Sequence, residues 1–230
     1  MTKETLLLTI AVLGGTGKEG KGLAYRWAKA GYRVLIGSRS SEKAVKAASE
    51  IMELLEGSSS VVGTTNLEAA ESSDIVVLTV PYSAHRETLE SVKDALNGKI
   101  LVDVTAPLVP PKVSKVQMPP AGSAAQEAKE ILGEDVEVVA AFQNVSHEHL
   151  LGEEDIECDV LVTGSSKKAR AEVLTLVEAT GLTGWDAGPI ENSVVVEGLT
   201  SVLININKLY GSKHSGIRIT GVPDKPSEST

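Results

Sequence analysis

One stretch near the start of the chain sets its architecture: Val12-Leu13-Gly14-Gly15-Thr16-Gly17-Lys18-Glu19-Gly20. The apolar run 6–13 that leads into it is typical of a strand buried on both faces of a parallel sheet. After it, apolar or small residues recur in steps of three and four over 20–31, which predicts a helix with one buried face. Strand, glycine turn and helix thus follow in the order that a dinucleotide site requires.

Each glycine of this stretch has a distinct expected role. Gly15 permits the tight turn, Gly17 lets the backbone approach a pyrophosphate, and Gly20 lets the helix lie close to the strand. The unpaired N–H groups at the start of the helix offer partial positive charge to phosphates. The alternative is a purely structural turn, because glycine turns are common.

Composition limits the classes of partner. The 230 residues carry a formal net charge of −9, which argues against nucleic acid as the main ligand. Cys158 is the single cysteine, so no internal disulfide can form, which suits a reducing cytoplasm. We expect no signal peptide after Lys3 and Glu4, and no apolar run approaches the roughly 20 residues that span a bilayer.

Apolar segments alternate with helical patterns along most of the chain. This alternation predicts an α/β fold: a doubly wound, mainly parallel sheet of the Rossmann type with a small C-terminal helical and strand extension. We assign 1–142 to the nucleotide-binding domain, 143–222 to a C-terminal part, and 223–230 to a disordered tail. The expected strands are 6–13, 32–37, 61–65, 74–80, 99–104, 136–142 and 159–163. The first helix is expected over 20–31, and later helices are expected to begin near 41, 83, 123, 166 and 192.

Two segments of this pattern carry further expectations. The segment 105–122 holds five prolines, which exclude a regular helix or central strand, and its place after a strand favours a ligand cover over a plain surface connection. The helix expected over 192–209 is apolar on several sides. Such a helix either threads the core or packs against a second subunit.

The end of the second strand selects the nucleotide. An acidic residue there binds a ribose 2′-hydroxyl, but this chain has Ser38 and Arg39, with Lys43 one helical turn further on. A hydroxyl, a guanidinium and an ammonium form a socket for a 2′-phosphate, which favours NADP over NAD. The alternative is a solvated helix start, although positive charge opposes the helix dipole there.

No residue pattern predicts a catalytic acid, a catalytic base or a metal site. Of the four histidines, we expect His85 to be solvated, and His147 and His149 to lie near the ligand edge of the sheet. His214 carries no assignment. A hydride donor and acceptor that are both cofactors need no enzymic proton, because positioning does most of the work.

The joint presence of several motifs identifies a resemblance over about residues 5–222. The chain resembles the coenzyme F420-dependent NADP oxidoreductases, which pass a hydride between NADP and an 8-hydroxy-5-deazaflavin. The motifs are Leu13-Gly14-Gly15-Thr16-Gly17, Gly37-Ser38-Arg39 with Lys43, Leu78-Thr79-Val80-Pro81, Pro107-Leu108-Val109-Pro110, Asp186-Ala187-Gly188-Pro189 and Gly216-Ile217.

The resemblance implies residue roles and a homodimer formed through the C-terminal part. Thr16, Gly17, Lys18, Glu19 and Gly20 would hold the pyrophosphate, Ser38, Arg39 and Lys43 the 2′-phosphate, and Val80 and Pro81 the nicotinamide side. The deazaflavin would lie against Gln143, Val145, Gly216 and Ile217.

The chain departs from the family after the sixth strand. A His-Thr pair is replaced there by Gln143-Asn144, and a small residue is replaced by His147, which we place with the cofactor-binding residues. Gln143 can still donate to a ring carbonyl.

Two other functions remain open at this point. One is an NADPH-dependent reductase of another acceptor, such as a flavin, an imine or a metal chelate. The other is a non-catalytic NADP-sensing protein. The direction of hydride transfer and the role of Lys112 and Lys115 in the proline-rich segment are not fixed by the sequence.

Overall fold

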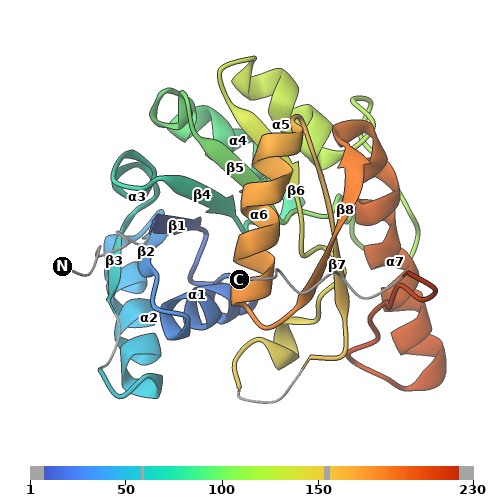
Figure 1. Ribbon diagram of the computed structural model, residues 1–230, viewed down its shortest axis with the longest axis horizontal. Helices are drawn as coiled ribbons and strands as arrows, with labels where there is room; N and C mark the ends of the chain where they lie inside the picture. Colours follow the sequence, from blue (N-terminus) through green and yellow to red (C-terminus); the bar gives the residue numbers. More distant parts are fainter. Residues whose placement is uncertain (1–7, 58–59, 153–155, 223–230) are drawn as a thin grey trace.

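The computed structural model describes residues 8–57, 60–152 and 156–222. In these ranges eight strands form one sheet in the order β3-β2-β1-β4-β5-β6-β7-β8 (Figure 1). The strands are β1 (Thr9–Leu13), β2 (Arg33–Ser38), β3 (Val61–Thr65), β4 (Ile75–Leu78), β5 (Ile100–Asp103), β6 (Glu137–Ala140), β7 (Asp159–Gly164) and β8 (Thr183–Pro189).

The first six strands are parallel, and the order reverses beside β1, which pairs with both β2 and β4. Strand β7 runs antiparallel to β6, and β8 is parallel to β7. The doubly wound, mainly parallel sheet with a C-terminal extension is therefore confirmed. Ligands of such sheets bind at the carboxyl ends of the strands next to the point where the order reverses.

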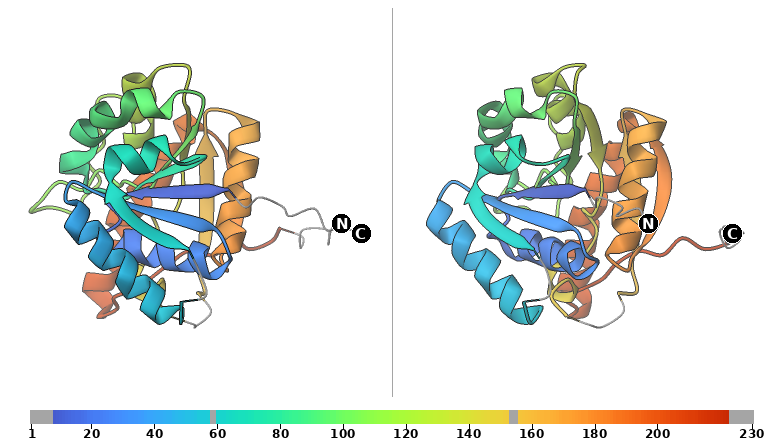
Figure 2. Two further views of the ribbon diagram at one scale, coloured as in Figure 1. Left: turned by 90° about the vertical axis from the view of Figure 1, so that its left-hand side faces the viewer. Right: turned by 60° about the vertical axis from the view of Figure 1, so that its left-hand side comes forward.

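Helices cover both faces of the twisted sheet (Figures 1 and 2). One face packs on α1, α2 and α6, and the other on α3, α4 and α5, as their buried side chains show. The bounds are α1 (Lys18–Lys29), α2 (Ser41–Leu54), α3 (Asn66–Glu71), α4 (Tyr82–Val92), α5 (Ala124–Leu132), α6 (Lys167–Ala179) and α7 (Ser193–Tyr210), with 3-10 turns η1 (Lys93–Leu96), η2 (His147–His149) and η3 (Ile190–Asn192).

Strand β1 shows why both faces are buried. Ile10 and Val12 belong to the core under α1, α2 and α6, while Ala11 and Leu13 belong to the core under α3, α4 and α5. Consecutive side chains of a strand point to opposite faces, so an unbroken apolar run requires a helical layer on each side.

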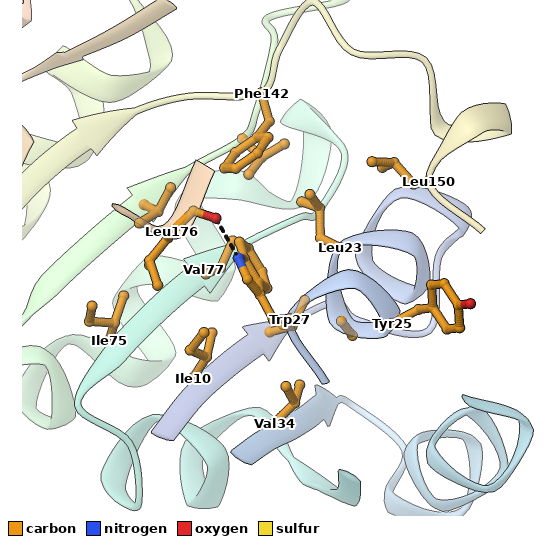
Figure 3. Packing of buried hydrophobic residues seen from close by; sticks show 14 of the residues in the cluster. Ile10, Leu23, Tyr25, Trp27, Val34, Ile75, Val77, Phe142, Leu150 and Leu176 are labelled. Atoms are coloured by element: carbon orange, nitrogen blue, oxygen red, sulfur yellow. Dashed lines mark hydrogen bonds between the residues drawn. The ribbon is translucent and has the colours of Figure 1, made fainter. Parts of the chain in front are cut away.

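Trp27 of α1 is the largest fully buried side chain (Figure 3). Its indole N–H donates to the carbonyl of Leu176 in α6 at 2.9 Å, so burial leaves no unpaired donor. Its ring packs against that of Phe142 in a T-shaped arrangement with a centroid separation of 5.8 Å. Phe142 follows β6 with a φ of 73°, a left-handed backbone that redirects the chain into Gln143.

The structure differs from the sequence expectations at a few elements. Helix α3 was not expected, and the helix expected over 83–96 ends in η1. Strands β4, β5 and β6 are two or three residues shorter than expected, whereas β7 is one residue longer. The segment 105–122 contains no helix or strand, as the prolines predict. The tail 223–230 lies outside the described residues, and the division into two parts at residue 142 stays a prediction.

Candidate functional site

A cavity of about 790 Å³ lies at the carboxyl ends of the strands around the reversal point. It brings together the glycine turn, the end of β2, the residues after β4 and β5, and the proline-rich segment. Its wall includes Gly14, Thr16, Gly17, Lys18, Glu19, Ser38, Arg39, Lys43, Asn66, Val80, Pro81, Tyr82, Thr105, Leu108, Pro110, Val113, Gln143 and Thr200. Ten of the predicted cofactor and coenzyme residues therefore share one cavity: Thr16, Gly17, Lys18, Glu19, Ser38, Arg39, Lys43, Val80, Pro81 and Gln143.

Gly14, Gly15 and Gly20 of the glycine turn are packed too closely to their neighbours to accept a side chain. Gly14, at φ 71°, supplies the left-handed turn position that the sequence pattern assigns to Gly15. A Cβ on Gly15 would lie 2.7 Å from the Val12 carbonyl oxygen, and one on Gly20 would lie 2.6 Å from Thr79 Oγ1. Gly15 and Gly20 thus stand behind the cavity wall and set the distance between helix and strand.

Gly17 has a different environment. A Cβ there would meet only the Gly14 carbonyl oxygen, at an ordinary 3.6 Å, and the residue is exposed on the cavity wall. Packing within the protein therefore does not require glycine at this position. Gly17 is also the N-cap of α1 and has no capping side chain, so the first N–H groups of the helix stay free for an anion.

Glu19 stands in the first turn of α1 and carries an unusual carboxyl group. The residue is part-exposed, but its Oε1 is shielded from solvent and has no hydrogen-bond partner among the described residues. Burial raises the pKa of Glu19 to about 8. The acid is therefore neutral near pH 7 and does not repel a phosphate at the start of the helix.

The expected phosphate socket lies where β2 ends and α2 begins, on the wall of the same cavity. Ser38 ends β2 and is buried, while Arg39 and Lys43 are exposed on the cavity wall. Neither cation forms an ion pair with a carboxylate in the described part of the chain. Two unneutralised cations at the start of α2 oppose its dipole, a cost that an anionic ligand would remove.

The residues after β4 form the next part of the wall. Val80 and Pro81 line the cavity, and so do Tyr82, Ser83 and Ala84 at the start of α4. Pro81 is the N-cap of α4 without a capping hydrogen bond. The sequence signal that places Tyr82 and Ser83 here is their position directly after Pro81 at a parallel-strand end.

The remaining wall comes from segments far apart in the sequence. The side-chain Nε2 of Gln143 donates a hydrogen bond to the main-chain oxygen of Asp103 at 2.7 Å. The main-chain oxygen of Gln143 accepts a hydrogen bond from Thr200 Oγ1 of α7 at 2.8 Å. The Oγ1 of Thr105 and the Oε1 of Gln143 are buried without a partner among the described residues. Such atoms cost free energy unless a ligand or water satisfies them.

His85 corrects an expectation: it is not solvated. Only 1% of its surface is exposed, and its Nε2 lies 2.7 Å from Asp103 Oδ2. Burial lowers the pKa of His85, but the nearby Asp103 carboxylate and then Glu127 more than offset this, so the net shift is upward. The partner comes from a strand 18 residues later, which no local pattern reveals.

Glu197 of α7 is a second buried acid near this pair. Its carboxylate accepts from the main-chain N–H groups of Ala124 and Ala125, at 2.6 and 3.0 Å, where α5 begins. Burial and the negative charge of Asp103 raise the pKa of Glu197 to about 8. The sequence offered no sign of this residue, because an isolated acid inside an apolar helix has no distinctive spacing.

Four predicted residues lie away from the main cavity. Val145 is buried in the hydrophobic core, and His147 belongs to η2. Gly216 lines a separate cavity of about 320 Å³, and Ile217 accepts a main-chain hydrogen bond from Asp159. Their ligand roles stay predictions, and Lys112 and Lys115 are exposed without lining either cavity.

Two kinds of feature are absent from the described residues. No helix in these ranges has the length and apolarity needed to cross a bilayer. No group of three or more histidine, cysteine, aspartate or glutamate side chains in them is arranged to hold a metal ion.

The fold and the cavity together define a nucleotide-binding α/β protein of the doubly wound type. The sequence pattern of a family described as "NADP oxidoreductase coenzyme F420-dependent" matches residues 9–107. The chain is 39% identical to the F420-dependent NADP reductase of Methanocaldococcus jannaschii, over 94% of this chain and 99% of that protein. It is 40% identical to the enzyme of the same name from Methanothermobacter thermautotrophicus, over 96% and 99% of the two chains.

The chain thus belongs to the family of coenzyme F420-dependent NADP oxidoreductases. A solved structure agrees in fold: a candidate F420-dependent NADP reductase from Arthrobacter sp. FB24 superposes with a TM-score of 0.77. The two chains are 26% identical, and the match covers 93% of this chain and 100% of the other.

Proposed function

We propose that this protein transfers a hydride between NADP(H) and the 8-hydroxy-5-deazaflavin coenzyme F420. Family membership and the names of its relatives support the reaction. The observation in this chain that carries the proposal is the unneutralised pair Arg39 and Lys43 on the wall of the cavity into which the uncapped start of α1 also opens. This combination fits a nucleotide with both a pyrophosphate and a 2′-phosphate.

The residues of the chain bind and orient the two partners. The N–H groups following Gly17 would hold the pyrophosphate, Ser38, Arg39 and Lys43 the 2′-phosphate, and Val80 and Pro81 the nicotinamide end. NADPH supplies the hydride when bound. The protein's contribution is to align the donor with the acceptor and to exclude water, for which it needs no proton-transferring side chain.

We place the acceptor at the end of the same cavity that lies beyond β4. Gln143 and Thr200 line the cavity, and so do Leu108, Pro110 and Val113 of the proline-rich segment. This arrangement supports the ligand-cover role of 105–122. Val145, His147, Gly216 and Ile217 enter the proposal only through the family resemblance, because they do not line this cavity.

The proposal extends to assembly and location. Helix α7 exposes Val194, Val195, Val202, Leu209 and Tyr210. An apolar surface of this kind on one helix supports a homodimer formed through the C-terminal part 143–222. A cytoplasmic location is consistent with Cys158, which is free and buried.

A two-component assay tests the function. Purified protein is mixed with NADPH and oxidised deazaflavin, and the absorbance of each is followed. Bleaching of the deazaflavin with oxidation of an equal amount of NADPH supports the proposal. NADPH oxidation only with a flavin, an imine or a metal chelate would instead show a reductase of another acceptor, and tight NADPH binding without any turnover would show a sensor.

A further inference from the structure

The acceptor end of the cavity is organised around one buried residue, Asp103. Its carboxylate Oδ1 accepts from the N–H of Thr105 at 2.9 Å, and its main-chain oxygen accepts from Gln143 Nε2 at 2.7 Å. Its other carboxylate oxygen meets His85 Nε2 at 2.7 Å. Thr105 and Gln143 both line the cavity, whereas Asp103 and His85 do not. The pair lies behind the wall and holds it in place.

The order of the strands indicates which ligand meets this wall. Arg39 follows β2 and Val80 follows β4, on the two sides of β1. A dinucleotide with its 2′-phosphate at Arg39 and its nicotinamide at Val80 crosses the reversal point in one direction. Thr105 and Gln143 follow β5 and β6, which lie beyond β4 in that same direction. The ring that meets them is therefore the hydride acceptor.

The charges around His85 come from three further elements. Glu127 of α5 approaches His85 Nδ1 at 4.0 Å and also pairs with Arg86 and Tyr82 of α4, at 2.6 and 2.8 Å. Glu197 of α7 is coupled electrostatically to Asp103. His85 thus lies among three carboxyl groups, whose negative charge favours its protonated form, and it is the basic side chain that pairs with Asp103.

We propose that His85 is a positioning residue for hydride transfer: by pairing with Asp103, it fixes Thr105 and Gln143 at the part of the wall that receives the acceptor. This inference rests on the proposed function for the nature of the acceptor. It assigns no step of the chemistry to His85, which does not line the cavity. It also separates two binding events, since no side-chain hydrogen bond or ion pair in the described residues joins His85 or Asp103 to the expected phosphate socket of Ser38, Arg39 and Lys43.

Equilibrium binding tests the inference without turnover. The dissociation constants of oxidised deazaflavin and of NADPH are measured for the wild type, His85→Leu and His85→Gln. In His85→Leu we expect the deazaflavin constant to rise about tenfold, as for loss of a buried hydrogen bond to a charged group. The NADPH constant should stay within about twofold. His85→Gln keeps an N–H donor for Asp103 and should restore most of the loss.

The pH profile distinguishes positioning from a general loss of structure. In the wild type, deazaflavin affinity should fall as pH rises through the raised pKa of His85, because the imidazolium loses its charge beside Asp103. This alkaline limb should be absent in His85→Gln. Glu197 has a pKa of about 8 and lies near Asp103, so Glu197→Gln is measured as well. A limb that survives His85→Gln and vanishes in Glu197→Gln would overturn the inference.

Matched controls make each remaining outcome decisive. Glu87→Gln removes an exposed charge from the same helix and should change neither constant. Thermal unfolding shows whether His85→Leu is folded, and if it is not, His85→Gln alone decides through its pH profile. Parallel weakening of NADPH and deazaflavin binding would contradict the inference. Binding of deazaflavin without turnover would contradict the proposed function. The role of His85 would then still be decided by the dissociation constants of deazaflavin and NADPH in the His85 variants.

Discussion

Arg39 carries a positive charge that no carboxylate in the described part of the chain neutralises. If it grips a 2′-phosphate, Arg39→Ala should raise the dissociation constant of NADPH by about 10- to 100-fold, the range for hydrogen bonds between charged groups. The constant for NADH should change by less than about threefold. Fluorescence titration with both nucleotides measures the ratio.

A charge-matched control for Arg39 lies on α2, the helix that follows it. Lys46 of α2 does not line the cavity, so Lys46→Ala should leave both constants unchanged. Equal losses of NADPH and NADH binding in Arg39→Ala would remove the assignment of the 2′-phosphate socket.

Glu19 gives nucleotide binding a pH dependence with a definite sign. Its pKa of about 8 in the folded protein means that the acid is neutral at pH 7 and ionises as pH rises. An anionic Glu19 repels the pyrophosphate, so the NADPH dissociation constant should increase above pH 8, by up to about tenfold per pH unit. Glu19→Gln should bind NADPH equally well from about pH 7 to 9, and a retained pH slope in that variant would refute this role.

The same carboxyl group affects folding stability. Its pKa is raised from 4.5 in the unfolded reference to about 8, so the folded state holds the proton more tightly. The contribution to the free energy of unfolding is therefore lost progressively as pH rises from about 4.5 to 8. Chemical denaturation at several pH values should show a shallower decline for Glu19→Gln than for the wild type.

At the scale of elements, Gly20 sets how closely α1 lies on the sheet. A Cβ at this position would come within 2.6 Å of Thr79 Oγ1 and 2.7 Å of the Gly15 Cα, so the helix would have to move away from the turn. Gly20→Ala should lower the free energy of unfolding by about 1–3 kcal/mol, as overpacking does. Urea denaturation measures the loss. Gly152→Ala is the control, because a Cβ at that position would have no neighbour within 4 Å.

How far the sequence predicts the elements depends on the range of the interactions that form them. The strand-turn-helix at Gly14 to Gly20 and the buried strands were predictable because their signals are local. Helix α3 escaped notice because its six residues are too few for a helical period, and a capping box of Thr65 with Glu68 starts it instead.

The candidate site divides in the same way. Residues next to a strand end, such as Ser38, Arg39 and Pro81, follow from the chain pattern. Asp103, His85 and Glu197 meet only through the packing of β5, α4 and α7, so no sequence spacing could indicate their contacts. Val145 lies in the hydrophobic core and Gly216 lines the second cavity, so nearness to a strand edge in the sequence does not by itself place a residue on the main cavity, and the ligand roles of both residues stay predictions.

For the whole molecule, the exposed face of α7 makes the assembly testable. Val195 and Leu209 are 64% and 69% exposed, an unfavourable arrangement for apolar side chains of a monomer. If this face joins two copies, Val195→Glu combined with Leu209→Glu should convert dimers into monomers, as measured by sedimentation. Leu54→Glu changes a similarly exposed leucine of α2 and should leave the assembly intact. A wild type that sediments as a monomer would refute the dimer.

The position of Trp27 gives the protein an optical signal of its own. The chain has two tryptophans, and only Trp27 is wholly enclosed, with its ring in a T-shaped contact with Phe142, the residue before Gln143. In a Trp185→Phe variant the ultraviolet emission comes from Trp27 alone. A rearrangement near Gln143 would change the surroundings of that indole, and its emission would then record the arrival of a ligand in real time, with no added dye.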